Sequence, residues 1–140
     1  MLGAALLVIG SSCFEQQEPI DVFLISVDTL RVDHVSPFNG DSPAQTPHIA
    51  ELARDGVRYT QAFSPVSVTG PAFCSMMTGL EPGRHGVLTN LFRGGEPLGE
   101  AHVTLAERFK SAGYKTGAFV SAFTLRQQLG LRQGFDFYNG

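Results

Sequence analysis

The sequence predicts an α/β fold in which helices cover a mostly parallel sheet. Short apolar runs rich in β-branched residues alternate with segments that carry helix start and stop signals. The order along the chain is strand, helix, strand, helix, helix, strand, and the 16 glycines and 8 prolines supply the turns between them. We expect this fold to be incomplete within the 140 residues, because no closing element follows the last strand.

The composition excludes two classes of protein. A hydrophobic content of 43% and a charged content of 16% indicate a globular chain, not a disordered one. The formal net charge is -3, and the sequence contains no cluster of Lys and Arg. We therefore expect no nucleic acid among its partners.

Residues 1–19 predict an export leader and a polar tether before a folded domain over residues 20–140. Residues 1–10 are almost wholly apolar, too few to span a bilayer but suited to the apolar region of a secretory signal. Small residues precede Cys13, which resembles the lipidated Cys of a bacterial lipoprotein. We expect an exported protein, periplasmic or anchored to the membrane through Cys13. The alternatives are an ordinary export signal and a misplaced start.

Three segments predict strands, over residues 20–27, 57–63 and 115–121; the second alternates loosely between apolar and polar residues, and the third is expected to be buried. The first is a continuous apolar run, typical of a strand buried on both faces of a parallel sheet. Asp28 follows it directly, and ligands of open α/β sheets bind at the carboxyl ends of strands. A buried carboxylate there must pair or bind a cation. The alternative is a turn Asp that caps the next segment.

Three further segments carry the end signals of helices, over residues 46–56, 71–78 and 104–113. We expect Thr46 to cap the first helix and Gly56 to end it. Gly79 is expected to end the second. The third opens with a capping box formed by Thr104 and Glu107.

Thr69 lies just ahead of the second predicted helix, followed by Gly70 and Pro71. A helix N-terminus presents unpaired N–H groups and the positive end of the helix dipole, and so favours an anion. A hydroxyl at this place could attack a phosphoryl or sulfuryl centre. The alternative, commoner in proteins at large, is a Thr that merely caps the helix.

Several motifs in order resemble the opening of sulfatases of the alkaline-phosphatase superfamily. They are VDTLRVDH at residues 27–34, TPHI at 46–49, GVRYTQAF at 56–63, MTGLEPGRHGV at 77–87, TLAE at 104–107 and AGYKT at 112–116. The resemblance covers nearly everything from residue 21 onward. It implies an alkaline-phosphatase-like layered fold and the N-terminal part of a sulfatase-like hydrolase.

The same resemblance implies roles for two residues. In the family an Asp after the first strand binds a divalent cation, which here is Asp28, while Thr29 stands where sulfatases often have a second Asp. The nucleophile lies nine residues before the Thr-Gly that ends its motif, so that counting back from Thr78 gives Thr69. Sulfatases oxidise a Cys or Ser there to formylglycine, whereas relatives that cleave phosphate diesters use an unmodified Thr. Thr69 is therefore expected to be a direct nucleophile and a metal ligand.

This chain departs from the sulfatase pattern at two places. Ala72 and Phe73 replace the Ser-Arg that follows the conserved Pro of the motif, and residues 118–123 replace a Gly-Lys-Trp-His segment. Cys74 lacks the following Pro and Arg that a modified Cys requires, and we expect it to be a buried helix residue.

These patterns together predict a metal-dependent hydrolase of sulfate or phosphate esters. Calcium is the expected cation, with zinc or magnesium as alternatives. The remaining metal ligands are expected beyond Gly140, and the 140 residues alone are expected to be inactive. One alternative is a non-catalytic, exported or lipid-anchored binding protein that kept the fold. Another is a small self-sufficient α/β binding domain.

Overall fold

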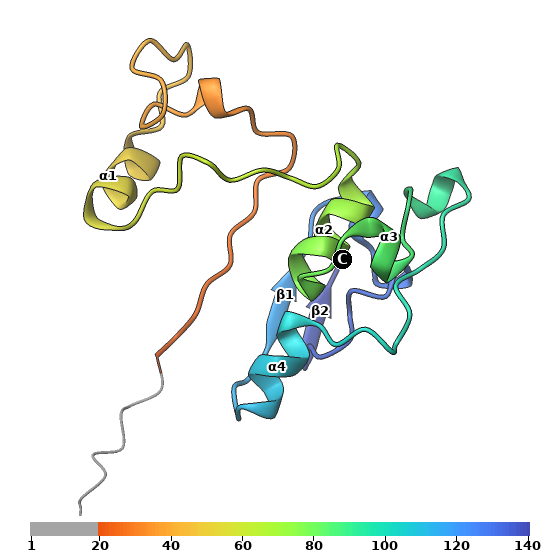
Figure 1. Cartoon of the computed structure of the whole chain (residues 1–140). Helices are drawn as coiled ribbons and strands as arrows, with labels where there is room; N and C mark the ends of the chain where they lie inside the picture. Colours follow the sequence, from red (N-terminus) through yellow and green to blue (C-terminus); the bar gives the residue numbers. More distant parts are fainter. Residues whose placement is uncertain (1–19) are drawn as a thin grey trace, which may run out of the picture.

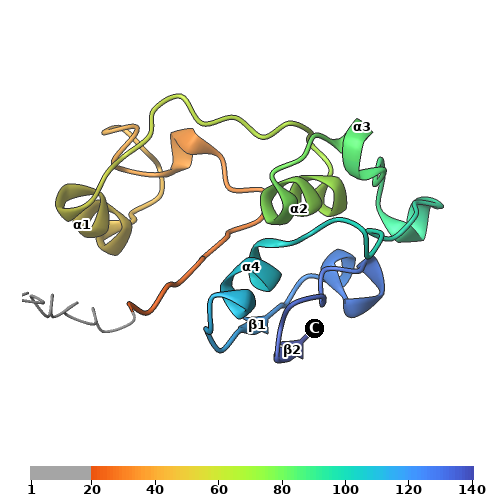
Figure 2. The ribbon, with the colours of Figure 1, turned by 60° about the horizontal axis from the view of Figure 1, so that its bottom comes forward.

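The computed structural model describes residues 20–140 (Figure 1). Its helices and strands in chain order are α1 (Pro47–Asp55), α2 (Thr69–Thr78), α3 (Pro82–His85), α4 (Leu105–Ser111), β1 (Gly117–Phe119) and β2 (Phe137–Asn139). Short 3-10 turns are η1 (Val32–His34), η2 (Leu91–Arg93), η3 (Phe123–Leu125) and η4 (Gln127–Leu129). In both views α1 lies apart from the group formed by α2, α3, α4 and the strands (Figures 1 and 2).

The sheet consists of β1 and β2, which pair in parallel with Gly117 opposite Phe137 and Phe119 opposite Asn139. Parallel strands need a crossover connection, and the turns η3 and η4 lie within it. β1 confirms a strand within residues 115–121, but its residues are exposed or half-buried and not buried as expected. The sequence pattern does not predict β2. The α/β class is confirmed, with a parallel sheet that is small in the described residues.

The strands predicted over residues 20–27 and 57–63 do not form, and these two predictions are wrong. Neither segment pairs with another part of the described chain, and their side chains are exposed, with Phe23 and Phe63 each 84% accessible. A strand is held by pairing and packing against its neighbours. The apolar pattern alone supplies no such neighbour.

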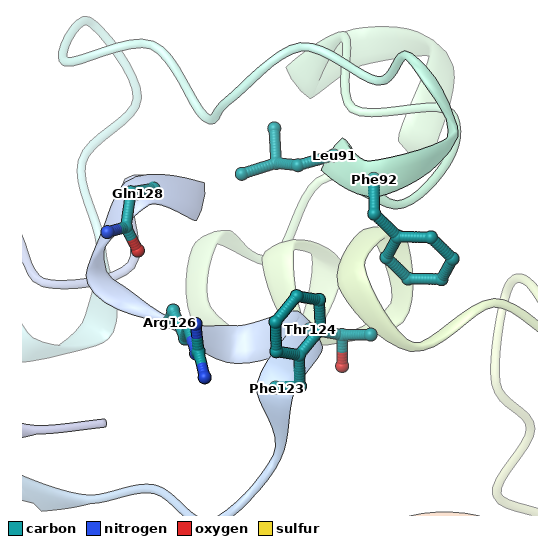
Figure 3. A pocket seen from close by; sticks show the side chains of 6 residues that line it. All are labelled: Leu91, Phe92, Phe123, Thr124, Arg126 and Gln128. Carbon is teal, nitrogen blue, oxygen red and sulfur yellow. The ribbon is translucent and has the colours of Figure 1, made fainter.

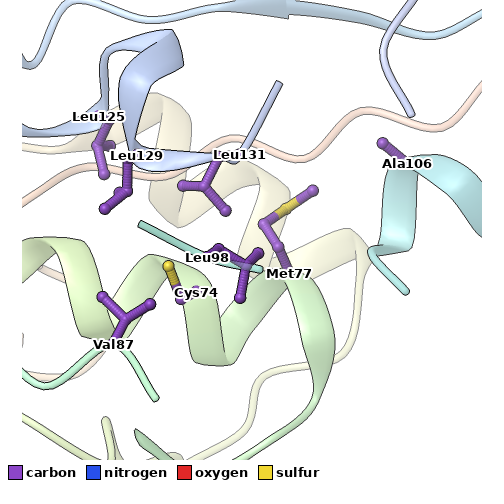
Figure 4. Packing of buried hydrophobic residues seen from close by; sticks show 8 residues of the cluster. All are labelled: Cys74, Met77, Val87, Leu98, Ala106, Leu125, Leu129 and Leu131. Atoms are coloured by element: carbon purple, nitrogen blue, oxygen red, sulfur yellow. The ribbon is translucent and has the colours of Figure 1, made fainter. Parts of the chain in front are cut away.

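The hydrophobic core lies between α2 and the turns η3 and η4. Its buried members are Cys74, Met77, Val87, Leu98, Ala106, Leu125, Leu129 and Leu131. Figure 4 shows Cys74 and Met77 on α2, close to the three leucines of the later segment. Each fully buried Leu contributes about 1.5–3 kcal/mol, so this packing fixes the orientation of α2 and with it the position of its first turn.

Local signals place the ends of two helices. α2 ends at Gly79, whose φ of 70° is a left-handed conformation that Gly adopts without steric cost. α4 opens with the predicted capping box: the Glu107 N–H donates to Thr104 Oγ1 at 3.2 Å, and the Thr104 N–H donates to Glu107 Oε2 at 2.7 Å. Both predictions are confirmed.

α1 confirms the helix predicted over residues 46–56 but not its cap. The Thr46 side chain makes no hydrogen bond to the helix. Its Oγ1 instead accepts a hydrogen bond from the Ser36 N–H at 3.0 Å and lies 2.8 Å from Ser36 Oγ. The Thr46 hydroxyl is bonded to Ser36 instead of the helix N–H groups, and this contact links the preceding loop to α1.

The leader and tether predicted over residues 1–19, including Cys13, lie outside the described residues. Among residues 20–140, no helix has the length and apolar character needed to cross a membrane. Export and lipid anchoring stay predictions.

Candidate active site

Asp28 and Thr69 meet in the structure although 41 residues separate them. The Thr69 hydroxyl donates a hydrogen bond to Asp28 Oδ2, and the two oxygens lie 3.1 Å apart. Asp28 belongs to a turn after the extended segment 20–27, and Thr69 is the first residue of α2. The fold thus brings together the two residues that the sequence analysis assigns to catalysis and metal binding.

The surroundings of Asp28 and Thr69 differ in two details from those that the sequence predicts. Asp28 is exposed, not buried, because the segment before it joins no sheet in the described chain. Thr69 is not the N-cap of α2, since Val68 holds that position and makes no side-chain cap. The interpretation of Thr69 as a plain helix cap is therefore excluded, and its hydroxyl is held by a carboxylate.

An open groove of about 1000 Å³ surrounds the pair. Its walls come from residues 26–30, residues 62–69, the outer side of α2 and the turn at 79–81. Figure 2 shows the extended segment that begins at residue 20 running up to α2. Ala72 and Phe73 lie in the lining, so the wall that α2 contributes next to Thr69 is apolar.

The turn that presents Asp28 is strained. Thr29 has a φ of 56°, the only positive φ at a non-Gly residue among residues 20–140. A left-handed conformation costs an ordinary L-residue about 1–2 kcal/mol, and such strain tends to occur at functional sites. The position of the Asp28 carboxylate therefore depends on a backbone conformation that is unfavourable for a Thr.

Asn90, which the sequence analysis does not identify, fixes the first turn of α2. Its Oδ1 accepts a hydrogen bond from the Gly70 N–H at 2.8 Å, and only 8% of the residue is exposed. Within residues 20–140, neither Asn90 Nδ2 nor the Thr69 N–H donates a hydrogen bond to another protein group. Two donors therefore remain available at the start of α2. No local signal marks Asn90, because its partner lies 20 residues away.

His85 supports α2 from its inner side and does not reach the groove lining. The residue is buried; its Nδ1 accepts a hydrogen bond from the Val87 N–H at 3.1 Å, and its Nε2 lies 3.0 Å from Ser75 Oγ. Burial lowers the pKa of His85, which favours the neutral ring. With Nδ1 accepting, the proton of the neutral ring is on Nε2 and can be donated to Ser75.

Cys74 is inert in this arrangement. It lies on the inner face of α2 with no exposed surface, as predicted for a buried helix residue. Burial raises the pKa of its thiol to about 12, so the reactive thiolate is absent at neutral pH. Thr69, not Cys74, presents its side chain to the groove.

The paired oxygens of Asp28 and Thr69 fit part of a cation site. Carboxylate and hydroxyl oxygens are donors that hard cations accept, and calcium takes about six to eight of them. Within residues 20–140, no three or more His, Cys, Asp or Glu side chains gather in a group that could hold a metal ion. The described residues therefore suit a divalent cation as a partial ligand set.

Residues 20–140 match the family model described as Sulfatase. The chain belongs to the sulfatase family. This confirms the resemblance found in the motifs and supports the sulfatase-like α/β fold. The individual roles of Asp28 and Thr69 stay predictions.

Several curated sulfatases align with this sulfatase-family chain. Arylsulfatase A of Bos taurus is 38% identical over 103 residues, which cover 71% of the chain and 20% of the relative. The N-acetylgalactosamine-6-O-sulfatase of Bacteroides thetaiotaomicron is 34% identical over 123 residues, 86% of the chain and 23% of the relative. Steryl-sulfatase of Mus musculus is 31% identical over 139 residues, 87% of the chain and 22% of the relative. The chain spans about a fifth of the length of these relatives.

Proposed function

We propose that the protein is a metal-dependent hydrolase of sulfate or phosphate esters, with Thr69 as its nucleophile. The observation that carries this proposal is the 3.1 Å hydrogen bond from the Thr69 hydroxyl to the Asp28 carboxylate. Membership of the sulfatase family supports ester hydrolysis, and the relatives carry the names of sulfatases.

The anionic centre of the ester binds at the first turn of α2. The helix dipole places partial positive charge there. Of the first N–H groups of α2, that of Thr69 is unbonded, because the Gly70 N–H donates to Asn90 and Pro71 has no N–H. The Thr69 N–H, whose residue lines the groove, is free to donate to the ester's oxygens. Asn90 Nδ2 has no protein partner among residues 20–140 but lies outside the groove lining, and we propose that it turns toward the bound ester. Donors fixed in this way stabilise charge that develops on those oxygens in the transition state.

Thr69 Oγ1 attacks the central sulfur or phosphorus atom, and the bond from that atom to the departing alcohol oxygen breaks. Before the attack, the hydroxyl proton lies in the hydrogen bond to Asp28 Oδ2, and this carboxylate oxygen is placed to receive the proton. The alcohol oxygen that departs in this first step takes a proton from solvent. Water then attacks the same central atom, the bond from that atom to Thr69 Oγ1 breaks, and Asp28 returns its proton to Thr69 Oγ1. The product is sulfate or phosphate, or a phosphate monoester when the substrate is a diester.

A divalent cation held by Asp28 and Thr69 would lower the pKa of the attacking hydroxyl and offset negative charge on the ester. Oxygen ligands favour calcium, with zinc or magnesium as alternatives. Removal of the metal with a chelator is expected to abolish turnover, and adding back each ion in turn identifies the cation. Full activity in the metal-free protein would contradict metal dependence.

An unmodified Thr separates this site from sulfatases that use formylglycine. Oxidation of a Thr hydroxyl would give a ketone, not the aldehyde of formylglycine. Direct attack by the Thr69 hydroxyl is therefore the proposed route, and phosphate diesters belong among the substrates to be tested. The mass of the peptide that contains Thr69 checks this point, and an oxidised side chain would contradict it.

The test of the nucleophile compares variants of a protein that carries the whole sulfatase-like domain, and it uses an aryl sulfate, an aryl phosphate and a phosphate diester. Thr69→Ala is expected to lose at least about a thousandfold in rate, whereas Thr69→Ser keeps the hydroxyl and measurable turnover. Thr60→Ala is the control, because Thr60 is an exposed Thr outside the groove lining. Turnover by Thr69→Ala at the rate of the unchanged protein would refute the assignment.

A further inference from the structure

A second, smaller cavity of about 210 Å³ lies between η2 and the turns η3 and η4 (Figure 3). Its lining consists of Leu91, Phe92, Phe123, Thr124, Arg126 and Gln128. None of these residues lines the groove around Asp28 and Thr69. The proposed chemistry gives this cavity no role.

Two aromatic rings dominate the cavity. The rings of Phe92 and Phe123 have centroids 6.1 Å apart and planes tilted by 56°, and both residues are more than half exposed. Figure 3 shows them extending from two different turns into the same space. Grouped, exposed aromatic side chains mark binding surfaces, and their faces and edges accept another flat ring.

Arg126 gives the cavity a positive charge. Its guanidinium carbon lies 4.3 Å from the centroid of the Phe123 ring, and within residues 20–140 it forms no ion pair. No Asp or Glu lines the cavity, and Gln128 adds an uncharged amide. A planar guanidinium beside an aromatic face favours a ligand that is both flat and anionic.

The cavity adjoins the start of α2. Leu91 in its lining directly follows Asn90, and Asn90 binds the N–H of Gly70, the residue after Thr69. Figure 3 shows α2 passing behind the lining residues. The contacts from Leu91 through Asn90 to Gly70 thus connect the cavity wall to the first turn of α2.

We propose that the cavity binds the organic group of the ester, an aryl ring that carries a second anionic substituent such as a carboxylate. This inference rests on the proposed function, because the ester itself is placed at Thr69. The ring stacks with Phe92 and Phe123, and the second anion pairs with Arg126. A cavity of about 150 Å³ holds one benzene molecule, so the volume here suits a single ring with a small charged group.

The test measures binding by calorimetry with three sulfonates that the protein cannot hydrolyse as esters. Methanesulfonate has no ring, benzenesulfonate adds one, and 4-sulfobenzoate adds the second negative charge. Affinity is expected to rise in that order. Phe123→Ala is expected to weaken both aryl sulfonates about three- to tenfold, and Arg126→Gln is expected to remove the advantage of 4-sulfobenzoate over benzenesulfonate.

Matched controls are an exposed Phe and an exposed Arg elsewhere. Phe119 lies on β1 and Arg108 on α4, both outside the cavity lining. Phe119→Ala and Arg108→Gln are expected to bind all three sulfonates as the unchanged protein does. Because Phe123 and Arg126 are exposed, their variants are expected to keep the melting temperature of the unchanged protein.

The outcomes separate this inference from the proposed function. A protein that carries the whole sulfatase-like domain and hydrolyses no ester, yet binds 4-sulfobenzoate through Phe123 and Arg126, would refute the hydrolase and support the cavity as an aryl-anion site. Protein that hydrolyses esters, but whose Phe123→Ala and Arg126→Gln variants bind all three sulfonates unchanged, would overturn the inference and leave the hydrolase intact.

Discussion

Thr29 combines a strained backbone with a position beside the carboxylate of Asp28, and one substitution tests both features. Asp enters the left-handed region more readily than a β-branched residue, and it adds a second carboxylate at the proposed metal site. Thr29→Asp is expected to raise calcium affinity by about tenfold, because calcium binding strengthens with the number of charged ligands. Calorimetric titration of metal-free protein with calcium measures the change.

The control for this substitution adds the same charge elsewhere. Thr60 is an exposed Thr outside the groove, so Thr60→Asp changes net charge without adding a ligand. Equal calcium affinity in Thr29→Asp, Thr60→Asp and the unchanged protein would mean that Thr29 does not border a calcium site.

Asn90 has two functions that can be separated by an isosteric change. Its Oδ1 holds the Gly70 N–H, and its Nδ2 is the donor proposed for the ester. Asn90→Asp keeps an acceptor for Gly70 but replaces the donor with negative charge. We expect the melting temperature to stay close to that of the unchanged protein, while kcat/KM falls by at least about a hundredfold.

Asn90→Ala provides the comparison, because it removes the acceptor as well. That variant is expected to lose stability, since the buried Gly70 N–H is left without a partner, at a cost of about 1–3 kcal/mol. Full activity in Asn90→Asp, measured with thermal unfolding as the folding check, would exclude Asn90 from substrate binding.

At the scale of the element, the first turn of α2 tolerates little change. A Cβ added at Gly70 would lie 2.8 Å from Asn90 Oδ1 and 3.7 Å from Leu129. Gly70→Ala therefore has two opposing effects on stability. The new Cβ makes a contact with an oxygen that is too short, whereas Ala is ordinarily more stable than Gly within a helix. We expect the clash to prevail and the free energy of unfolding to fall by about 1–3 kcal/mol.

Gly83 in α3 is the matched control, because no atom lies within 4 Å of a Cβ added there. Gly83→Ala is expected to leave stability unchanged or raise it by about 0.5–1 kcal/mol. Denaturant unfolding followed by circular dichroism compares the two variants. Equal stabilities for both would show that α2 adjusts to the added methyl group.

The elements that the sequence predicts correctly are those whose signals are local. The end of α2 at Gly79 and the capping box of α4 depend on a few adjacent residues. Strands depend on partners, so the apolar segment 20–27 is wrongly predicted as a strand, while β2 goes unpredicted beside β1. The candidate site divides in the same way: family motifs find Asp28 and Thr69, whereas Asn90 acts across a distance that no local pattern reports.

At the scale of the whole molecule, α2 connects stability with the site. Cys74 and Met77 on its inner face belong to the core, and Thr69 at its start faces the groove. His85 of α3 joins this arrangement through Ser75, one of the residues that also line the groove. A change in protonation of His85 therefore acts on the packing that holds the site in place.

The pKa of His85 predicts that acid weakens the whole fold. Burial lowers it below the ordinary 6.5, with a further lowering from His102 and opposing contributions from Pro71 and Glu81. Well above pH 6.5, both the folded and the unfolded chain keep this ring neutral, and stability does not depend on it. Below about pH 6.5 the unfolded chain binds a proton at His85, whereas the folded protein keeps this ring neutral. The free energy of unfolding then falls by up to about 1.4 kcal/mol per pH unit, until the folded ring also protonates.

Thermal unfolding between pH 8 and pH 5 measures this effect in a pH range that lies above the titration of Asp136. A hydrogen bond from Lys110 lowers the pKa of Asp136 to about 2, so its contribution is lost only as the pH falls from about 3.8 toward 2. His85→Gln is expected to melt at a lower temperature at pH 8 but to lose less between pH 6.5 and pH 5. His48→Gln alters an exposed His on α1 and is expected to keep the original slope. If His85→Gln keeps that slope as well, the acid sensitivity of the fold comes from another group.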